Sequence, residues 1–156
     1  MSISAPYRHF ADRDAMLAAA ALAGFRDLES RFAELPEIQA FGDWTAQIAV
    51  AYLRFAQEDP ARFEVMFAGG FDKSEHDDLM RQANRIQEQL EAALEPHFTG
   101  RRSSVAGRAA ELWSLAHGVA TLAVEGGLGH AVSDRSFDQV AESAARAWSV
   151  GVDSCS

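Results

Sequence analysis

The chain contains little cysteine and little lysine among its 156 residues. Cys155 is the only cysteine, which excludes an internal disulfide and a cysteine metal cluster and favours a reducing, cytoplasmic location. Lys73 is the only lysine, and the 14 lysines and arginines together face 23 acidic residues, giving a net charge of −9. This balance argues against nucleic acid as a partner of the whole surface, because binding phosphate needs concentrated positive charge.

Long apolar runs are also missing. No stretch of about 18 apolar residues occurs, so we expect no transmembrane helix and no membrane partner. The start has neither the charged nor the apolar region of a secretory signal. A hydrophobic fraction of 48% is nevertheless ordinary for a globular domain, and the length is that of one domain with its own core.

Strand-like alternation, hairpin turns and internal repeats are absent, and helical periodicity dominates. In the first helix, for example, Leu17, Ala21, Phe25, Leu28 and Phe32 recur at steps of three or four. The pattern predicts an all-α domain of six or seven helices. The expected helices cover residues 12–35, 43–58, 60–68, 74–94, 105–125 and 137–152.

Capping residues support these boundaries. Asp12 is expected to cap the first helix, and Asp59 to cap a short helix that begins at Pro60. Ser74 is expected to cap the long helix that ends near Leu94, with Asp77 completing a capping box. Ser136 with Gln139 predicts a capping box for the last helix.

Catalytic and metal-binding patterns are weak. Glu75, His76, Asp77 and Asp78 are consecutive, so they fan around a helix instead of sharing one face, and the acidic ones suit a helix N-terminus. The glycines at 126, 127 and 129 lack the preceding strand of a phosphate-binding loop. We therefore expect no enzymatic activity, no metal site and no cofactor.

Three stretches resemble one family. Tyr7, His9, Phe10, Asp12 and Arg13, followed by Leu17, resemble the end of the helix-turn-helix recognition helix and the next helix in TetR-family transcriptional regulators. Trp113-Ser-Leu-Ala-His117-Gly118 resembles the Trp-x-x-x-His-Gly motif of one subclass of TetR C-terminal domains, as does Asp59-Pro60-Ala-Arg-Phe63-Glu-Val-Met66-Phe67. The resemblance covers essentially the whole chain and implies an all-α domain that binds a ligand and dimerises.

The resemblance also implies a DNA-binding role for the opening residues. Tyr7, His9 and Arg13 would contact phosphate, and Ile3 and Ser4 would meet base edges in the major groove. The family has two further helices before this point. We interpret residues 1–11 as a remnant of the recognition helix, left by a misassigned or truncated start, and residues 12–156 as the ligand-binding and dimerisation domain. We expect this chain alone not to bind operator DNA specifically. The alternative is a short protein that has lost DNA binding.

The buried aromatic residues allow two interpretations. Trp113 and His117 are four residues apart on one helix face, where they either belong to the core or line a ligand cavity with His117 as its polar group. The other expected wall residues are Phe25, Tyr52, Phe55, Met66 and Phe67. Apolar, aromatic walls favour a hydrophobic or aromatic ligand.

The last two long helices predict a dimer. Residues 105–125 are apolar nearly all round, which indicates a helix buried on most sides, and residues 137–152 are rich in alanine. Ala144, Ala147, Trp148 and Gly151 are the expected interface residues, although packing within one chain is the alternative. The hypothesis is a ligand-responsive repressor that acts as a dimer. The alternative is a dimeric small-molecule-binding module without DNA binding.

Overall fold

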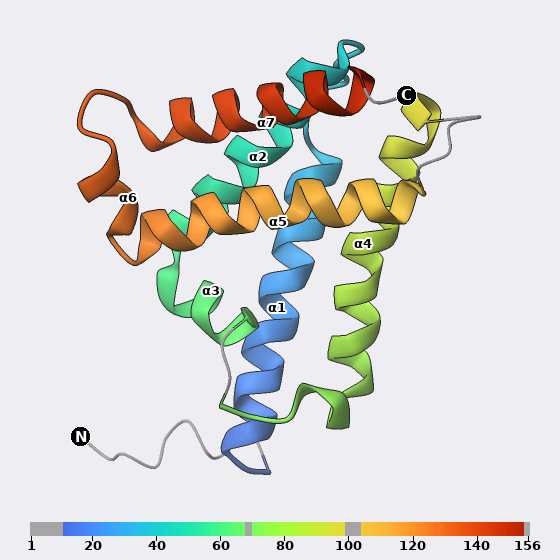
Figure 1. The fold of residues 1–156 in the computed structure, drawn as a ribbon. Coiled ribbons are helices and arrows are strands. Elements are labelled where there is room, and N and C mark those ends of the chain that lie inside the picture. The colour runs from blue at the N-terminus through green and yellow to red at the C-terminus, as the bar shows by residue number, and fades with distance from the viewer. Residues whose placement is uncertain (1–10, 68–69, 99–103, 155–156) are drawn as a thin grey trace.

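The computed structural model describes residues 11–67, 70–98 and 104–154. Within these ranges the chain forms seven α-helices, one short 3₁₀ helix and no strand, which confirms the predicted all-α class. The elements are α1 (Arg13–Ala33), α2 (Phe41–Glu58), α3 (Pro60–Phe67), η2 (Lys73–Glu75), α4 (Asp77–Phe98), α5 (Val105–Val124), α6 (Gly127–Ala131) and α7 (Phe137–Ser154). Figure 1 shows their arrangement.

Three of the predicted helix starts are confirmed by their hydrogen bonds. The Asp12 carboxylate accepts from Ala15 N at 2.8 Å, and the Asp59 carboxylate accepts from Arg62 N at 3.0 Å. At the start of α7, Ser136 N donates to Gln139 Oε1 at 2.9 Å and Gln139 N donates to Ser136 Oγ at 3.2 Å. These bonds satisfy backbone N–H groups that have no partner within a helix.

The start and end of α4 differ from the prediction. Ser74 does not cap this helix, because it lies in η2 and donates its hydroxyl to Asp72. The helix begins at Asp77 and continues past Leu94 to Phe98, with Pro96 inside its last turn. Pro96 removes one backbone donor, but Ala92, whose carbonyl loses that donor, is exposed to water.

The glycines that follow α5 end this helix and also lead into a further short helix. Gly126 has a φ of +81°, the left-handed conformation that favours glycine at a helix C-terminus. The chain then forms the short helix α6, which the sequence did not predict. Three other predicted boundaries moved by two residues each, with α1 ending at Ala33, α2 beginning at Phe41 and α7 ending at Ser154.

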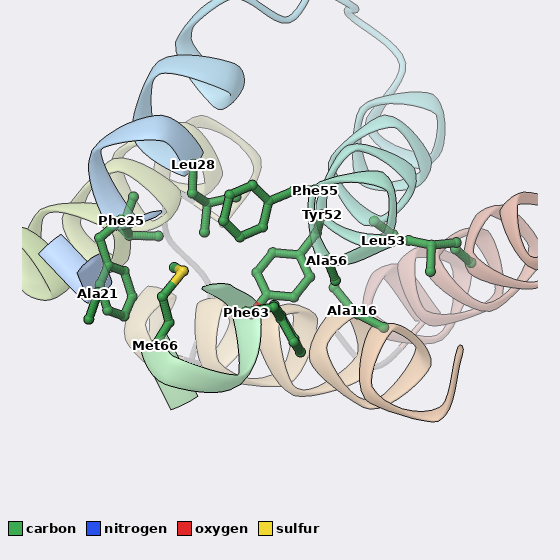
Figure 2. Packing of buried hydrophobic residues seen from close by; sticks show 14 of the residues in the cluster. Ala21, Phe25, Leu28, Tyr52, Leu53, Phe55, Ala56, Phe63, Met66 and Ala116 are labelled. Atoms are coloured by element: carbon green, nitrogen blue, oxygen red, sulfur yellow. The ribbon is translucent and has the colours of Figure 1, made fainter. Parts of the chain in front are cut away.

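Helix α2 lies at the centre of the packing and contacts α1, α3, α5 and α7. Its aromatic residues meet those of α1 and α3 in the larger of two hydrophobic clusters, which Figure 2 shows from close by. The side chains that converge there include Phe25, Leu28, Tyr52, Phe55, Phe63 and Met66. The smaller cluster joins the C-terminal half of α4 to α5 and α7, around Leu94, Phe98 and Leu112.

Helices α5 and α7 pack against each other and cross the same side of the molecule (Figure 1). Contrary to the prediction, α5 is not buried on most sides within one chain. Ala109, Leu112, Ala116 and Ala120 form its buried stripe, while its opposite face is exposed. No helix in the described part of the chain is long and apolar enough to span a membrane.

Candidate functional site

A cavity of about 380 Å³ lies among α1, α2, α4 and α5. Its deep walls are buried side chains from each of these helices, among them Leu28, Tyr52, Ile86, Leu90 and Leu112. The exposed lining residues Met80, Asn84 and Trp113 mark its opening between α4 and α5. The site has the apolar walls and few polar groups that are typical of small-molecule pockets, and its volume is at the small end of their range.

The predicted wall residues divide between this cavity and its surroundings. Four of the seven line it, namely Phe25, Tyr52, Phe67 and Trp113. Phe55 and Met66 are buried in the same hydrophobic cluster but are not part of the cavity lining. Phe55 lies instead under two guanidinium groups, with Arg31 Cζ 5.4 Å and Arg62 Cζ 5.9 Å from its ring centre. His117 lines a separate groove.

The Tyr52 hydroxyl links Trp113 and His117 in one hydrogen-bonded group. Its hydroxyl lies 2.9 Å from His117 Nδ1, and Trp113 Nε1 donates to the same oxygen at 3.4 Å. The indole N–H can only donate, so the Tyr52 oxygen accepts from Trp113, and its O–H is free to donate to His117 Nδ1 when that nitrogen carries no proton. In that arrangement His117 is neutral, with its proton on Nε2.

Burial favours the same neutral state. Removal from water lowers the pKa of His117 and raises the pKa of Tyr52 well above its ordinary value. The rings of Phe63 and Phe67 lie 5.4 and 4.6 Å from the imidazole centre, so the histidine is surrounded by aromatic groups. At neutral pH the group holds no net charge, and it provides directional polar contacts instead of an acid or a base.

The groove on the other side of His117 is more exposed. It has a volume of about 650 Å³ and lies between α3 and the C-terminal half of α5. Among its lining residues only Phe63 is buried, and Glu64 and Glu125 at its edge are exposed. Phe67 lines both the groove and the cavity, so this ring separates the two spaces. The cavity with its buried, apolar walls is therefore the better candidate for binding a small molecule.

Sequence reasoning missed the contribution of α4 to the cavity. Leu79, Ala83, Ile86 and Leu90 recur at steps of three or four, the spacing of one buried helix face, and these side chains line the cavity. Lys73 in η2 also lines it and was not assigned a role. Periodicity shows that one helix face is buried but cannot show whether that face meets side chains or a cavity. The one available signal for Lys73 was that it is the only lysine.

Comparisons with known proteins identify the family. Residues 45–147 match the family described as "Tetracyclin repressor-like, C-terminal domain". The chain belongs to this family. A solved structure described as "Structure of a protein with unknown function from Rhodococcus sp. RHA1" has the same fold, with a TM-score of 0.70 and 23% identity over 97% of this chain and 78% of that one. A comparison with curated proteins gave no match.

The region of this tetracyclin repressor-like domain that matches the family contains most of the cavity. It extends from Thr45, near the start of α2, to Ala147 in α7, and so includes Tyr52, Trp113 and His117. Helix α1 precedes the matched region but supplies Phe25, Leu28 and Phe32 to the cavity wall.

The residues expected to contact DNA lie mostly outside the described part of the chain. Ile3, Ser4, Tyr7 and His9 all belong to residues 1–10. Arg13 is described as the exposed first residue of α1, where its Nη1 donates to Gly70 O at 3.0 Å and lies 3.7 Å from Asp14. Its contact with phosphate stays a prediction.

The expected interface residues lie on two sides of α7. Ala147 and Gly151 are exposed, Ala144 is half-buried, and Trp148 packs inward beside Phe41. The indole of Trp148 also donates to Glu111 Oε2 at 3.1 Å, which links α7 to α5. Ala147 and Gly151 are therefore the members of this set that a second chain can reach.

Proposed function

We propose that this chain is the ligand-sensing part of a one-component transcriptional regulator of the TetR type. In this proposal a small hydrophobic or aromatic molecule occupies the cavity, two chains pair through α5 and α7, and a helix-turn-helix head contacts operator DNA. The observation that carries the proposal is an apolar cavity of about 380 Å³, open between α4 and α5, inside a domain whose family is regulatory.

Exposed apolar side chains support the pairing of two chains. Of the four large hydrophobic residues that are exposed in the described part of the chain, three lie on α5 and α7: Trp113 at 41%, Leu122 at 49% and Val150 at 66%. A Cβ added at Gly118 or Gly151 would meet nothing within 4 Å, so close approach is possible at both. Exposed apolar side chains on these two helices favour contact with a partner, and an isologous pairing would bury the same residues on both chains.

Helix α1 connects the cavity to the N-terminal end of the domain. Phe25, Leu28 and Phe32 line the cavity, and Arg13 at the start of the same helix bonds to Gly70 in the segment that follows α3. A ligand that pushes on α1 would thus move the helix that leads to the head. Such a switch works only if the ligand binds one arrangement more tightly than the other.

The expected effect on DNA is a change in spacing. Two recognition helices of a dimer must lie about 34 Å apart to enter successive major grooves. In the ligand-free dimer the distance between the two recognition helices would match the distance between successive major grooves. In the ligand-bound dimer that distance would differ, and the operator would be released. The proposal assigns the chain to the Trp-x-x-x-His-Gly subclass, with His117 held by Tyr52 as the polar group next to the cavity.

The test is made on the native protein from its source organism. Its intact mass is measured, and its binding to the DNA upstream of its own gene is followed by gel shift. We expect a mass above the 17.0 kDa of this chain and a sequence-dependent shift. A mass of 17.0 kDa without a shift would favour the alternative, a dimeric small-molecule-binding module without DNA binding.

A further inference from the structure

Lys73 provides a positive charge at the edge of the apolar cavity. It lies in η2, between α3 and α4, and is half-buried. Its Nζ donates to Met66 O at 2.7 Å and lies 5.9 Å from the ring centre of Phe71. Because an ammonium group has three N–H donors, two remain for a further acceptor.

The other cations of the described chain are arranged differently. Seven arginines form ion pairs with carboxylates, for example Arg31 with Glu58 and Arg146 with Asp43. Within the described ranges Lys73 has no such carboxylate partner, and neither do Arg26, Arg85 and Arg135, which are exposed to water. Lys73 is therefore the one cation among these four that lines the cavity.

The surroundings of Lys73 leave its charge incompletely solvated. Partial burial lowers the pKa of this ammonium group, because its apolar neighbours stabilise the charged form less well than water does. An anion placed beside Nζ would compensate for that loss. The remaining cavity wall is mainly apolar and offers no second cation, so it matches one negative charge attached to an apolar body.

We infer that the cavity binds an apolar monocarboxylate, whose carboxylate accepts from Lys73 Nζ while its apolar part lies among α1, α2, α4 and α5. This inference names the ligand class for the cavity and rests on the proposed function. A volume of about 380 Å³ suits a medium-chain or arylalkyl acid better than a long lipid.

The acidic surface opposes this ligand only weakly. The net charge is −9, and the exposed Asp72 and Glu75 flank Lys73 in the sequence. At physiological ionic strength, however, exposed charges are screened beyond about 8 Å, whereas a half-buried contact with Nζ is screened much less. The short-range contact therefore determines which head group is preferred.

Three probes of equal chain length separate head group from tail. Decanoate, 1-decanol and decylamine are titrated into the full chain below their aggregation concentrations, by calorimetry and by tryptophan fluorescence. We expect decanoate to bind on the order of tenfold more tightly than 1-decanol, and decylamine to bind more weakly than both. Shortening the acid to octanoate removes two CH₂ groups and should weaken binding about fourfold for each.

Two matched variants locate the anchor. Lys73→Gln and Arg85→Gln each remove one positive charge, but Arg85 is exposed on α4 and does not line the cavity. We expect Lys73→Gln to abolish the preference for decanoate over 1-decanol and Arg85→Gln to leave it unchanged. Lys73→Arg, which keeps the charge, should retain most of the preference.

The possible results separate failure of the carboxylate preference at Lys73 from failure of ligand binding in the cavity. If decanoate and 1-decanol bind equally to the wild type, or if Lys73→Gln and Arg85→Gln behave alike, the inference fails while the ligand cavity stands. Tighter binding of decylamine would overturn it in the same way. If none of the three probes binds, the proposed sensing function itself loses its support.

Discussion

At the scale of single residues, His117 shows how burial determines what a side chain can do. The sequence identified it as the polar group of a cavity or of the core, and the structure gives it Tyr52 as a hydrogen-bond partner beside a wall of aromatic rings. Its four-residue spacing from Trp113 was visible in the sequence. That Tyr52, 65 residues away, connects the two could only come from the packing of α2 against α5.

The lowered pKa of His117 predicts a pH dependence of stability. Because its pKa in the folded chain lies below the ordinary value near 6.5, the unfolded chain binds more protons as the pH falls through that range. The contribution of His117 to the free energy of unfolding is therefore complete above about pH 7.5 and decreases toward pH 5.5 or so. The measurement is urea unfolding at both pH values.

Two variants serve as the comparison. His117→Gln removes the titrating imidazole and with it the loss of stability that His117 causes at low pH. The free energy of unfolding of this variant should therefore change less between the two pH values than that of the wild type. In His130→Gln, which alters an exposed residue of α6, the wild-type decrease should persist. Equal behaviour of the two variants would show that His117 does not cause the effect.

Gly24 is the second residue whose role depends on a distant contact. A Cβ at this position would collide with the thioether of Met66 and lie 3.2 Å from Arg62 Cγ, because α1 and α3 approach closely here. Helix propensity alone predicts that Gly24→Ala stabilises the chain by about 1 kcal/mol. We expect the opposite, a loss of ~1–3 kcal/mol in the free energy of unfolding, because overpacking a buried contact outweighs propensity.

A double-mutant cycle tests this explanation. Met66→Ala removes the atoms that the new Cβ would meet, so Gly24→Ala should become neutral or stabilising in that background. Chemical denaturation of the wild type, both single variants and the double variant gives the coupling energy. An equal loss in both backgrounds would mean that Met66 is not the cause.

At the scale of elements, the capping residues predicted a helix start correctly where that start depends only on residues close to it in the sequence. The caps at Asp12, Asp59 and Ser136 form as predicted, because each depends on a side chain and a backbone N–H only two or three residues away. The start of α4 is the exception. Asp72 accepts from both the backbone N and the hydroxyl of Ser74, which places Ser74 inside a 3₁₀ turn instead of at an α-helix start.

This contrast predicts different effects for two similar substitutions. Ser136→Ala removes a capping-box hydroxyl and should lower the free energy of unfolding by ~1 kcal/mol. Ser74→Ala removes an exposed hydrogen bond within a turn and should lower it by less than about 0.5 kcal/mol. Thermal or urea unfolding of both variants measures the difference. A larger loss for Ser74→Ala would restore Ser74 as the important cap.

At the scale of the whole molecule, the exposed face of α5 and α7 is the feature that one chain leaves unexplained. Residues 105–125 are apolar nearly all round in the sequence, and within one chain Trp113 and Leu122 of this helix stay exposed. Whether a second chain covers this face stays a prediction. Its test is the oligomeric state in solution.

Ala147 and Ala23 provide a matched pair for that test. Both are exposed alanines within helices, on α7 and α1 respectively, so mutation to glutamate introduces the same charge at each. We expect Ala147→Glu to weaken self-association by at least about tenfold, because two buried carboxylates would face each other across the interface. Ala23→Glu should remain as associated as the wild type.

Sedimentation velocity and light scattering over a concentration series measure the association of both variants. Circular dichroism checks that each is still folded, since both substitutions lie on exposed positions. A monomeric wild type, or equal association of the two variants, would contradict pairing through α7.

The sequence by itself determined the class of the fold, most of the helices and their caps, and the family. The fold class, the helices and their caps depend on periodicity and on contacts between residues a few positions apart, whereas the family followed from the resemblance of short motifs. The apolar stripes also identified Phe25, Tyr52, Phe67 and Trp113, all of which line the cavity.

Only the tertiary structure decided what those buried faces enclose. Phe55 and Met66 have the same aromatic or apolar character as the lining residues, yet they fill the core, whereas Lys73 and the α4 stripe line the cavity. The physical reason is that a cavity is the space left unfilled when six separate segments pack together. No pattern in a short stretch of sequence shows how well distant segments fill the space between them. The position of Lys73 beside the cavity could therefore be known only from the packed structure.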